Sequence, residues 1–138
     1  MAFAGDLRPI EAWELLTAEP AAQLVDVRTR PEWSFVGIPN LGSIGKKPIF
    51  LAWQAYPAMQ INPTFGEELR RIAPSPETPL LFICRSGTRS RAAAETMTAL
   101  GYRRCYNVAE GFEGQVDAEG HRGRKAGWKA AGLPWNQD

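Results

Sequence analysis

One stretch of this chain carries the residue types that support nucleophilic chemistry. Four apolar residues, 80–83, run into Cys84, and a short loop with one glycine and two arginines follows. The apolar run predicts a buried strand, and the residues after it predict a helix with Ser90 as its N-cap. The helix dipole, the N–H groups of a tight loop and the charges of Arg85 and Arg89 all favour a thiolate, which is the nucleophilic form of cysteine. We therefore interpret Cys84 as a nucleophile.

The loop Cys84-Arg85-Ser86-Gly87-Thr88-Arg89 resembles the six-residue active-site loop, CRxGxR, of the rhodanese family. A second match lies earlier, where Asp26-Val27-Arg28 is followed by Glu32-Trp33 and resembles the DVR…E–[FW] signature near the start of rhodanese domains. The resemblance covers roughly residues 5–134 and is weakest between 37 and 62.

This resemblance implies a thiosulfate sulfurtransferase of the rhodanese type. Cys84 would accept a sulfane sulfur from a small anionic donor such as thiosulfate, hold it as a persulfide, and pass it to cyanide, a thiol or a protein cysteine. The resemblance implies neither a metal nor an organic cofactor. The residues expected to bind the donor and the persulfide are those of the loop, namely Arg85, Ser86, Gly87, Thr88, Arg89 and Ser90.

Two other functions remain open at this point. Cysteine phosphatases use a Cys-x5-Arg loop, but here the sixth position after Cys84 is Ser90, so the loop is one residue shorter and suits a sulfur better than a phosphate group. The chain could also be a persulfide carrier or sensor that docks on a protein partner, for which the aromatic residues Trp33, Trp53 and Trp135 are candidate contacts.

Alternating strand and helix patterns surround the loop and predict an α/β fold with a parallel sheet. Strands are expected at 6–7, 23–27, 80–83 and 104–108, and helices at 9–18, from 64 onward and at 90–100. In the second helix, Phe65, Leu69 and Ile72 share a face, and Thr64 and Glu67 have capping-box spacing. The rhodanese resemblance implies a three-layer fold, with a central sheet of about five strands and helices on both faces.

Polar residues at other strand ends are expected near Cys84. Sites in open parallel sheets lie beyond the carboxyl ends of the strands, so Asp26 and Arg28 should lie on the side of Cys84. We interpret them as supporting residues in an ion-pair network with Glu32. The turn at Gly111-Phe112 resembles the one that closes the rhodanese active site. His121, the only histidine of the sequence, is interpreted as a surface or structural residue.

The least informative parts of the sequence are the segment 37–62 and the C-terminal tail. Rhodanese domains have a G-H-I-P-G-A segment where this chain has Gly37-Ile38-Pro39-Asn40-Leu41 and no histidine. A short strand is expected near residues 43–44, and Trp53 belongs either to the core or to a pocket wall. In the tail, Trp128, Ala131, Leu133 and Trp135 predict a last short helix and an apolar strap.

Length and composition limit the remaining possibilities. The 138 residues predict one domain, 1–138, and the net charge of +1 gives no reason to expect a nucleic-acid partner. No apolar run suggests a membrane span and no signal-peptide pattern is visible, so a cytoplasmic location is expected. Cys84 and Cys105 are predicted at opposite ends of neighbouring strands, too far apart for a disulfide. The sequence specifies neither the oligomeric state nor the physiological donor and acceptor.

Overall fold

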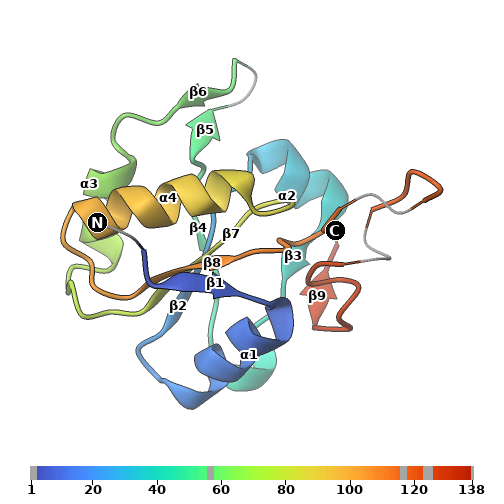
Figure 1. The fold of residues 1–138 in the computed structure, drawn as a ribbon, viewed down its shortest axis with the longest axis horizontal. Coiled ribbons are helices and arrows are strands. Elements are labelled where there is room, and N and C mark those ends of the chain that lie inside the picture. Colours follow the sequence, from blue (N-terminus) through green and yellow to red (C-terminus); the bar gives the residue numbers. More distant parts are fainter. Residues whose placement is uncertain (1–2, 56–57, 116–117, 123–125, 138) are drawn as a thin grey trace.

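The computed structural model describes residues 3–55, 58–115, 118–122 and 126–137. Within these ranges a central sheet of five strands has the order β1-β8-β7-β2-β4, and every neighbouring pair is parallel (Figure 1). The strands of this sheet are β1 (Gly5–Leu7), β8 (Cys105–Val108), β7 (Leu80–Ile83), β2 (Gln23–Asp26) and β4 (Ile49–Phe50). The predicted α/β class with a parallel sheet is confirmed.

Helices cover both faces of the sheet. α1 (Pro9–Ala18) lies on one face, and α3 (Phe65–Ile72) and α4 (Thr88–Ala99) lie on the other (Figure 1). Each face carries its own apolar cluster: one includes Phe65, Phe82 and Met97, and the other includes Leu16 and Trp128. The central strand β7 is buried along its whole length, as its unbroken apolar sequence predicted.

The first helix spans the predicted residues. Pro9 occupies its first position, where a missing N–H costs nothing, and the N–H of Arg8 donates to Glu11 Oε1 at 2.8 Å. Leu16 of this helix is buried against the sheet, whereas Ile10 is 46% exposed.

Two helix starts differ from the prediction. α4 begins at Thr88 with Gly87 as N-cap, so Ser90 lies in the first turn and is not the N-cap. Gly87 has a left-handed conformation, φ +110°, which is not helical, so the helix can begin only after it. In α3, Thr64 Oγ1 contacts Glu68 at 3.1 Å instead of forming the predicted pair with Glu67.

The short peripheral elements depart most from the prediction. Residues Gly42–Ile44 form a 3₁₀ turn instead of a strand. The tail forms turns and then β9 (Trp135–Asn136), which pairs antiparallel with β3 (Ile38–Pro39), so the predicted last helix is wrong. The remaining elements are α2 (Arg30–Val36), β5 (Gln54–Ala55) and β6 (Gln60–Ile61). No helix in the described ranges is long and apolar enough to cross a membrane.

Candidate active site

Cys84 lies at the topological switch point of the sheet, where successive connections run to opposite sides. β2 and β7 are neighbours, and the chain leaves β2 toward β4 but leaves β7 toward β8 on the opposite side. Such a reversal opens a crevice beyond the carboxyl ends of the two strands, where ligands of open α/β sheets bind. Cys84 follows β7 directly, and Arg28 lies two residues beyond β2.

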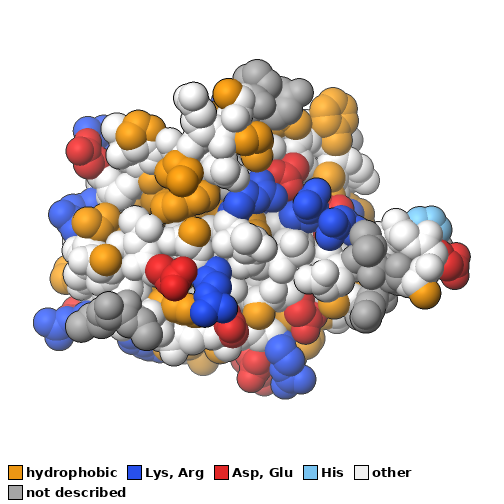
Figure 2. Space-filling view, turned by 45° about the horizontal axis from the view of Figure 1, so that its top comes forward, with side chains coloured by type: hydrophobic (Ala, Val, Ile, Leu, Met, Phe, Trp, Pro, Cys, Tyr) orange, Lys and Arg blue, Asp and Glu red, His pale blue; other side chains and the backbone are white. Residues whose placement is uncertain are grey.

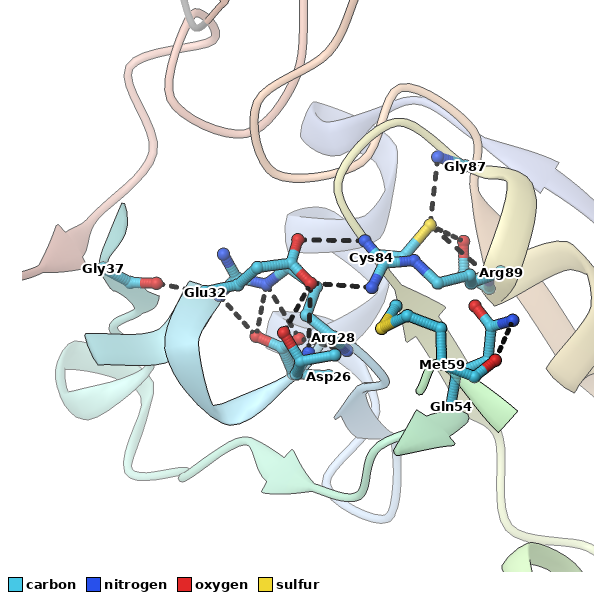
Figure 3. Close-up of polar contacts among 11 residues, drawn as sticks. Asp26, Arg28, Glu32, Gly37, Gln54, Met59, Cys84, Gly87 and Arg89 are labelled. Atoms are coloured by element: carbon cyan, nitrogen blue, oxygen red, sulfur yellow. Dashed lines mark hydrogen bonds and ion pairs between the residues drawn. The ribbon is translucent and has the colours of Figure 1, made fainter. Parts of the chain in front are cut away.

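The loop after β7 curls around the sulfur of Cys84. The N–H of Gly87 donates to Cys84 Sγ at 3.1 Å, and the N–H of Ser90 donates at 3.4 Å (Figure 3). The hydroxyl oxygen of Ser90 lies 3.1 Å from the same sulfur. Backbone N–H groups that converge on one atom favour negative charge there. Cys84 is 1% exposed, so these contacts form in a site that is almost closed.

Two glycines allow a second loop to pack against the first. A Cβ at Gly87 would lie 2.2 Å from the carbonyl oxygen of Ala109, and one at Gly111 would lie 2.5 Å from that of Arg85. The N–H of Phe112 donates to the carbonyl of Cys84 at 2.8 Å. Gly111 therefore has a geometric role, because it allows the two loops to approach, and Phe112 is a fully buried packing residue.

Arg89 and Glu32 form an ion pair beside the sulfur loop. Arg89 Nη1 and Nη2 donate to the two carboxylate oxygens at 2.7 and 2.9 Å (Figure 3). Burial opposes ionisation of Glu32, but the hydrogen bonds from Arg89 and from the Thr29 N–H outweigh it and lower the pKa of Glu32 to about 2. The same contact raises the pKa of Arg89. Arg89 is thus held in place by Glu32.

Asp26 and Arg28 form a separate, fully buried ion pair. Arg28 Nη2 donates to Asp26 Oδ2 at 2.8 Å and also to the carbonyl of Gly37 at 2.8 Å. The guanidinium carbon lies 4.3 Å from the centre of the Phe112 ring. The pair therefore ties the end of β2 to the start of β3 and to the turn after β8. The predicted network is only partly right, because Glu32 binds Arg89 and Thr29.

The other predicted binding residues lie on the outer side of the loop. Arg85 and Thr88 are exposed, and Ser86 is half-buried. Figure 2 shows Lys and Arg side chains gathered on this face, near the N-terminal end of α4. Arg85 is therefore a charged loop side chain that an anion in solution can reach.

A groove of about 740 Å³ lies beside α2, and its lining includes Thr29, whose N–H and hydroxyl bind Glu32. Its walls come from α2 and from residues within 50–55 and 60–63, and they include Trp33 and Phe50. The Trp33 and Phe50 rings meet edge to face, with centres 5.2 Å apart. Trp53 lies outside this wall: it is 8% exposed and packs on Phe65 in the core.

Cys105 and His121 lie away from the sulfur loop, whereas Asn107 and Asp6 join it although the sequence did not mark them. Cys105 is a free thiol in β8 opposite Leu80, at the other end of β7 from Cys84, as predicted. Burial raises the pKa of Cys105 to about 11. His121 is exposed in the segment 118–122. Asn107 of β8 and Asp6 of β1 join the site through Ser90, and no local pattern marked either residue. Among the described residues, no group of three or more His, Cys, Asp or Glu is placed to hold a metal ion.

Comparison with known proteins identifies the family of this chain. A family model described as the STR4 middle domain matches residues 7–138. An uncharacterized protein of Rickettsia conorii is 40% identical over 126 residues, which cover 91% of each chain. The thiosulfate sulfurtransferase GlpE of Actinobacillus succinogenes is 28% identical over 134 residues, 97% of this chain and 91% of that one. The chain belongs to the rhodanese-like family.

A solved structure matches this rhodanese-like chain along almost its entire length. The crystal structure of Rv0390 from M. tuberculosis is similar with a TM-score of 0.90 and 47% sequence identity, and the match covers 99% of this chain and 100% of that one. The predicted rhodanese-like fold is therefore confirmed.

Proposed function

We propose that this single rhodanese-like domain is a sulfurtransferase in which Cys84 carries the transferred sulfur as a persulfide. The observation that carries the proposal is the convergence of the Gly87 and Ser90 N–H groups on the Cys84 sulfur, in a loop with an exposed arginine. Donors of this kind stabilise a sulfur anion in the way that an oxyanion hole stabilises an oxyanion. The thiosulfate sulfurtransferase among the relatives supports the same chemistry.

With thiosulfate as donor, the reaction has two displacement steps. The Cys84 thiolate attacks the outer sulfur of thiosulfate, a new S–S bond forms, and the old S–S bond breaks so that sulfite leaves with the electron pair. The acceptor, cyanide or a thiolate, then attacks the outer sulfur of the persulfide, and the Cys84 thiolate leaves. Arg85 would bind the anionic donor, and the Arg89–Glu32 pair would hold the loop in position.

Intact mass after incubation with thiosulfate, without reductant, tests this proposal. We expect the protein to gain the mass of one sulfur atom, cyanide to reverse the gain, and the Cys84→Ala variant to show none. Cys105 remains in that control, so labelling at the second cysteine would be visible. If wild type gains no sulfur from thiosulfate, or if the Cys84→Ala variant gains as much, the proposal is wrong.

The groove beside α2 supports a second candidate function, a persulfide carrier that docks on a protein partner. Its wall includes Trp33, Phe35 and Phe50, and Phe35 is 78% exposed. In this second candidate function, a persulfide carrier, the loaded protein would transfer sulfur slowly to cyanide and quickly to a partner. Comparing transfer rates to cyanide and small thiols with the rate to candidate acceptor proteins tests it.

A cysteine phosphatase is the least supported alternative. The loop is one residue shorter than the Cys-x5-Arg loop of cysteine phosphatases, and both terminal nitrogens of Arg89 donate to Glu32. An aryl-phosphate assay separates the two activities, and we expect no turnover that depends on Cys84.

A further inference from the structure

A chain of side-chain hydrogen bonds runs from β1 to the candidate nucleophile. Asn107 Nδ2 donates to Asp6 Oδ1 at 3.0 Å, and the Ser90 hydroxyl lies 2.6 Å from Asn107 Oδ1. The same hydroxyl lies 3.1 Å from Cys84 Sγ. Ser90 is fully buried and Asn107 is 3% exposed, so water has little access to the contacts of Ser90 with Asn107 and with Cys84.

Asp6 determines which way the Asn107 amide points. An ionised carboxylate only accepts hydrogen bonds, so the Asn107 atom that faces Asp6 must be the NH₂ group. The amide oxygen of Asn107 is then left facing Ser90. The opposite orientation would place two acceptor oxygens against each other at 3.0 Å.

The Asn107 oxygen in turn determines where the Ser90 hydroxyl proton lies. A hydroxyl has one proton, and an amide oxygen has none to donate. At 2.6 Å the proton must therefore lie between Ser90 Oγ and Asn107 Oδ1. Ser90 then presents a lone pair to Cys84 Sγ, so the thiol donates to the hydroxyl.

We propose that Asn107 is a positioning residue that keeps the proton of the Ser90 hydroxyl directed away from the Cys84 sulfur. Asp6 maintains this by fixing the amide of Asn107. The inference rests on the proposed function only in taking Cys84 as the reacting thiol.

The arrangement affects the states of Cys84 differently. The neutral thiol has an acceptor for its proton in Ser90. The thiolate has only the N–H groups of Gly87 and Ser90 as described donors, unless the hydroxyl turns and leaves two oxygens unpaired at 2.6 Å. In a persulfide the inner sulfur has neither proton nor full charge, so it does not require the Ser90 proton. Asn107 therefore disfavours the bare thiolate relative to the thiol, because it withholds the Ser90 proton as a donor to the charged sulfur. The inner sulfur of the persulfide loses nothing by this, because it needs no such donor.

Other charges near Cys84 act on its ionisation but do not depend on the Ser90 proton. They are Arg85 of the loop, Arg89 of α4 with its partner Glu32 of α2, the buried Asp26–Arg28 pair after β2, and Asp6 on β1. A test must therefore separate the hydrogen-bond chain from the general charge environment. Removal of the Ser90 hydroxyl does this.

The test is the pH dependence of Cys84 alkylation by iodoacetamide, followed by intact mass. The proteins are wild type, Asn107→Leu, Ser90→Ala and the double variant, with Cys84→Ala used to subtract labelling at Cys105. Asn107→Leu frees the Ser90 proton for the thiolate. We expect the midpoint of its rate profile to fall by about one pH unit, which is the worth of one hydrogen bond to a charged group. In the Ser90→Ala background the same substitution should leave the midpoint unchanged.

Two results would overturn the inference. One is an unchanged or higher midpoint in Asn107→Leu, and the other is an equal shift with and without the Ser90 hydroxyl. If Asn107→Leu does not fold, Asp6→Asn at an exposed position replaces it, because an amide there lets Asn107 rotate. The midpoint of the alkylation profile of Asp6→Asn should shift further to lower pH when the Ser90 hydroxyl is present than in the Ser90→Ala background. Equal shifts in the two backgrounds would again overturn the inference. Iodoacetamide needs no sulfur donor, so this result is independent of whether thiosulfate loads the protein.

Discussion

The guanidinium of Arg89 and the carboxylate of Glu32 form two parallel hydrogen bonds, 2.7 and 2.9 Å long, that join the start of α4 to α2. Glu32 also accepts from the N–H and the hydroxyl of Thr29, so it caps α2 and holds Arg89 at once. The position of the sulfur loop therefore depends on a helix about 50 residues earlier in the chain.

Replacing Arg89 by lysine should lower kcat/KM for thiosulfate by about tenfold. A lysine cannot form the two-pronged contact with Glu32, so the first turn of α4 loses its fixed position against α2. The matched control is Arg103→Lys, which alters an exposed pair with Glu77 and should leave turnover unchanged. Steady-state kinetics of both variants measure the effect. Equal rates in wild type and Arg89→Lys would contradict the positioning role.

The stability contributed by Glu32 should be lost in acid. Its pKa is lowered to about 2 in the folded protein, so the contribution is complete above the unfolded value near 4.5 and disappears as the pH falls toward 2. Denaturant unfolding of wild type and Glu32→Gln between pH 7 and pH 2 measures this. We expect a difference of about 1–2 kcal/mol at pH 7 that shrinks below about pH 4.5. A difference that stays constant down to pH 2 would rule out the ion pair as its source.

Arg85→Ala should raise the KM for thiosulfate severalfold and change the free energy of unfolding by less than about 0.5 kcal/mol. The side chain is exposed on the sulfur loop, so it can attract an anion without supporting the core. Arg85→Lys keeps the charge and should retain most of the affinity. Kinetics at low and high salt test the role of the charge, because screening at high salt should raise the KM of the wild type toward that of the alanine variant. An unchanged KM in Arg85→Ala would exclude the role in donor binding.

Gly87→Ala should destabilise the protein by at least about 2 kcal/mol and abolish sulfur loading. The position has φ +110°, and a Cβ there would lie 2.2 Å from the Ala109 carbonyl oxygen. Gly101→Ala is the matched control, since Gly101 has φ +108° with no atom within 4 Å of the added Cβ. Denaturant unfolding of the two variants separates backbone strain from the close contact. Equal losses would show that the contact with Ala109 has no cost.

Lys46→Met should lower the free energy of unfolding by about 2 kcal/mol. Lys46 Nζ donates to the carbonyl oxygens of Leu16, Glu19 and Ala22 at 2.7–2.8 Å, and so caps the end of α1 from a distant segment. Lys47→Met removes the same charge at an exposed neighbour and should change stability by less than about 0.5 kcal/mol. Thermal or denaturant unfolding of both variants measures the two changes in stability. Similar losses of unfolding free energy in Lys46→Met and Lys47→Met would show that the effect comes from net charge and not from the capping contacts.

Elements with strong local signals were predictable from the sequence. The unbroken apolar run of β7 can only be buried, and Pro9 marks the start of α1, so both were located correctly. The start of α4 was placed two residues late. Ser90 has the side chain of a good N-cap, but the left-handed turn at Gly87 puts the helix start at Thr88 and directs Ser90 to the sulfur instead.

Short edge strands were not predictable, because their stability comes from a partner and not from their own sequence. β9 consists of two residues that pair with β3 about 97 positions earlier, and the same tail sequence suggested a helix. Trp53 was assigned equally to core and pocket, and packing against Phe65 decided for the core.

The sequence by itself determined the α/β class, the cysteine at the end of a buried strand and the glycine-containing loop that follows it, because these depend on neighbouring residues. Only the tertiary structure decided which polar and charged groups bind one another. Glu32 with Arg89, Lys46 with α1, and Asp6 with Asn107 and Ser90 join residues that lie 17 to 101 positions apart. No local pattern encodes such pairs, since they form only when the fold brings these distant segments of the chain together.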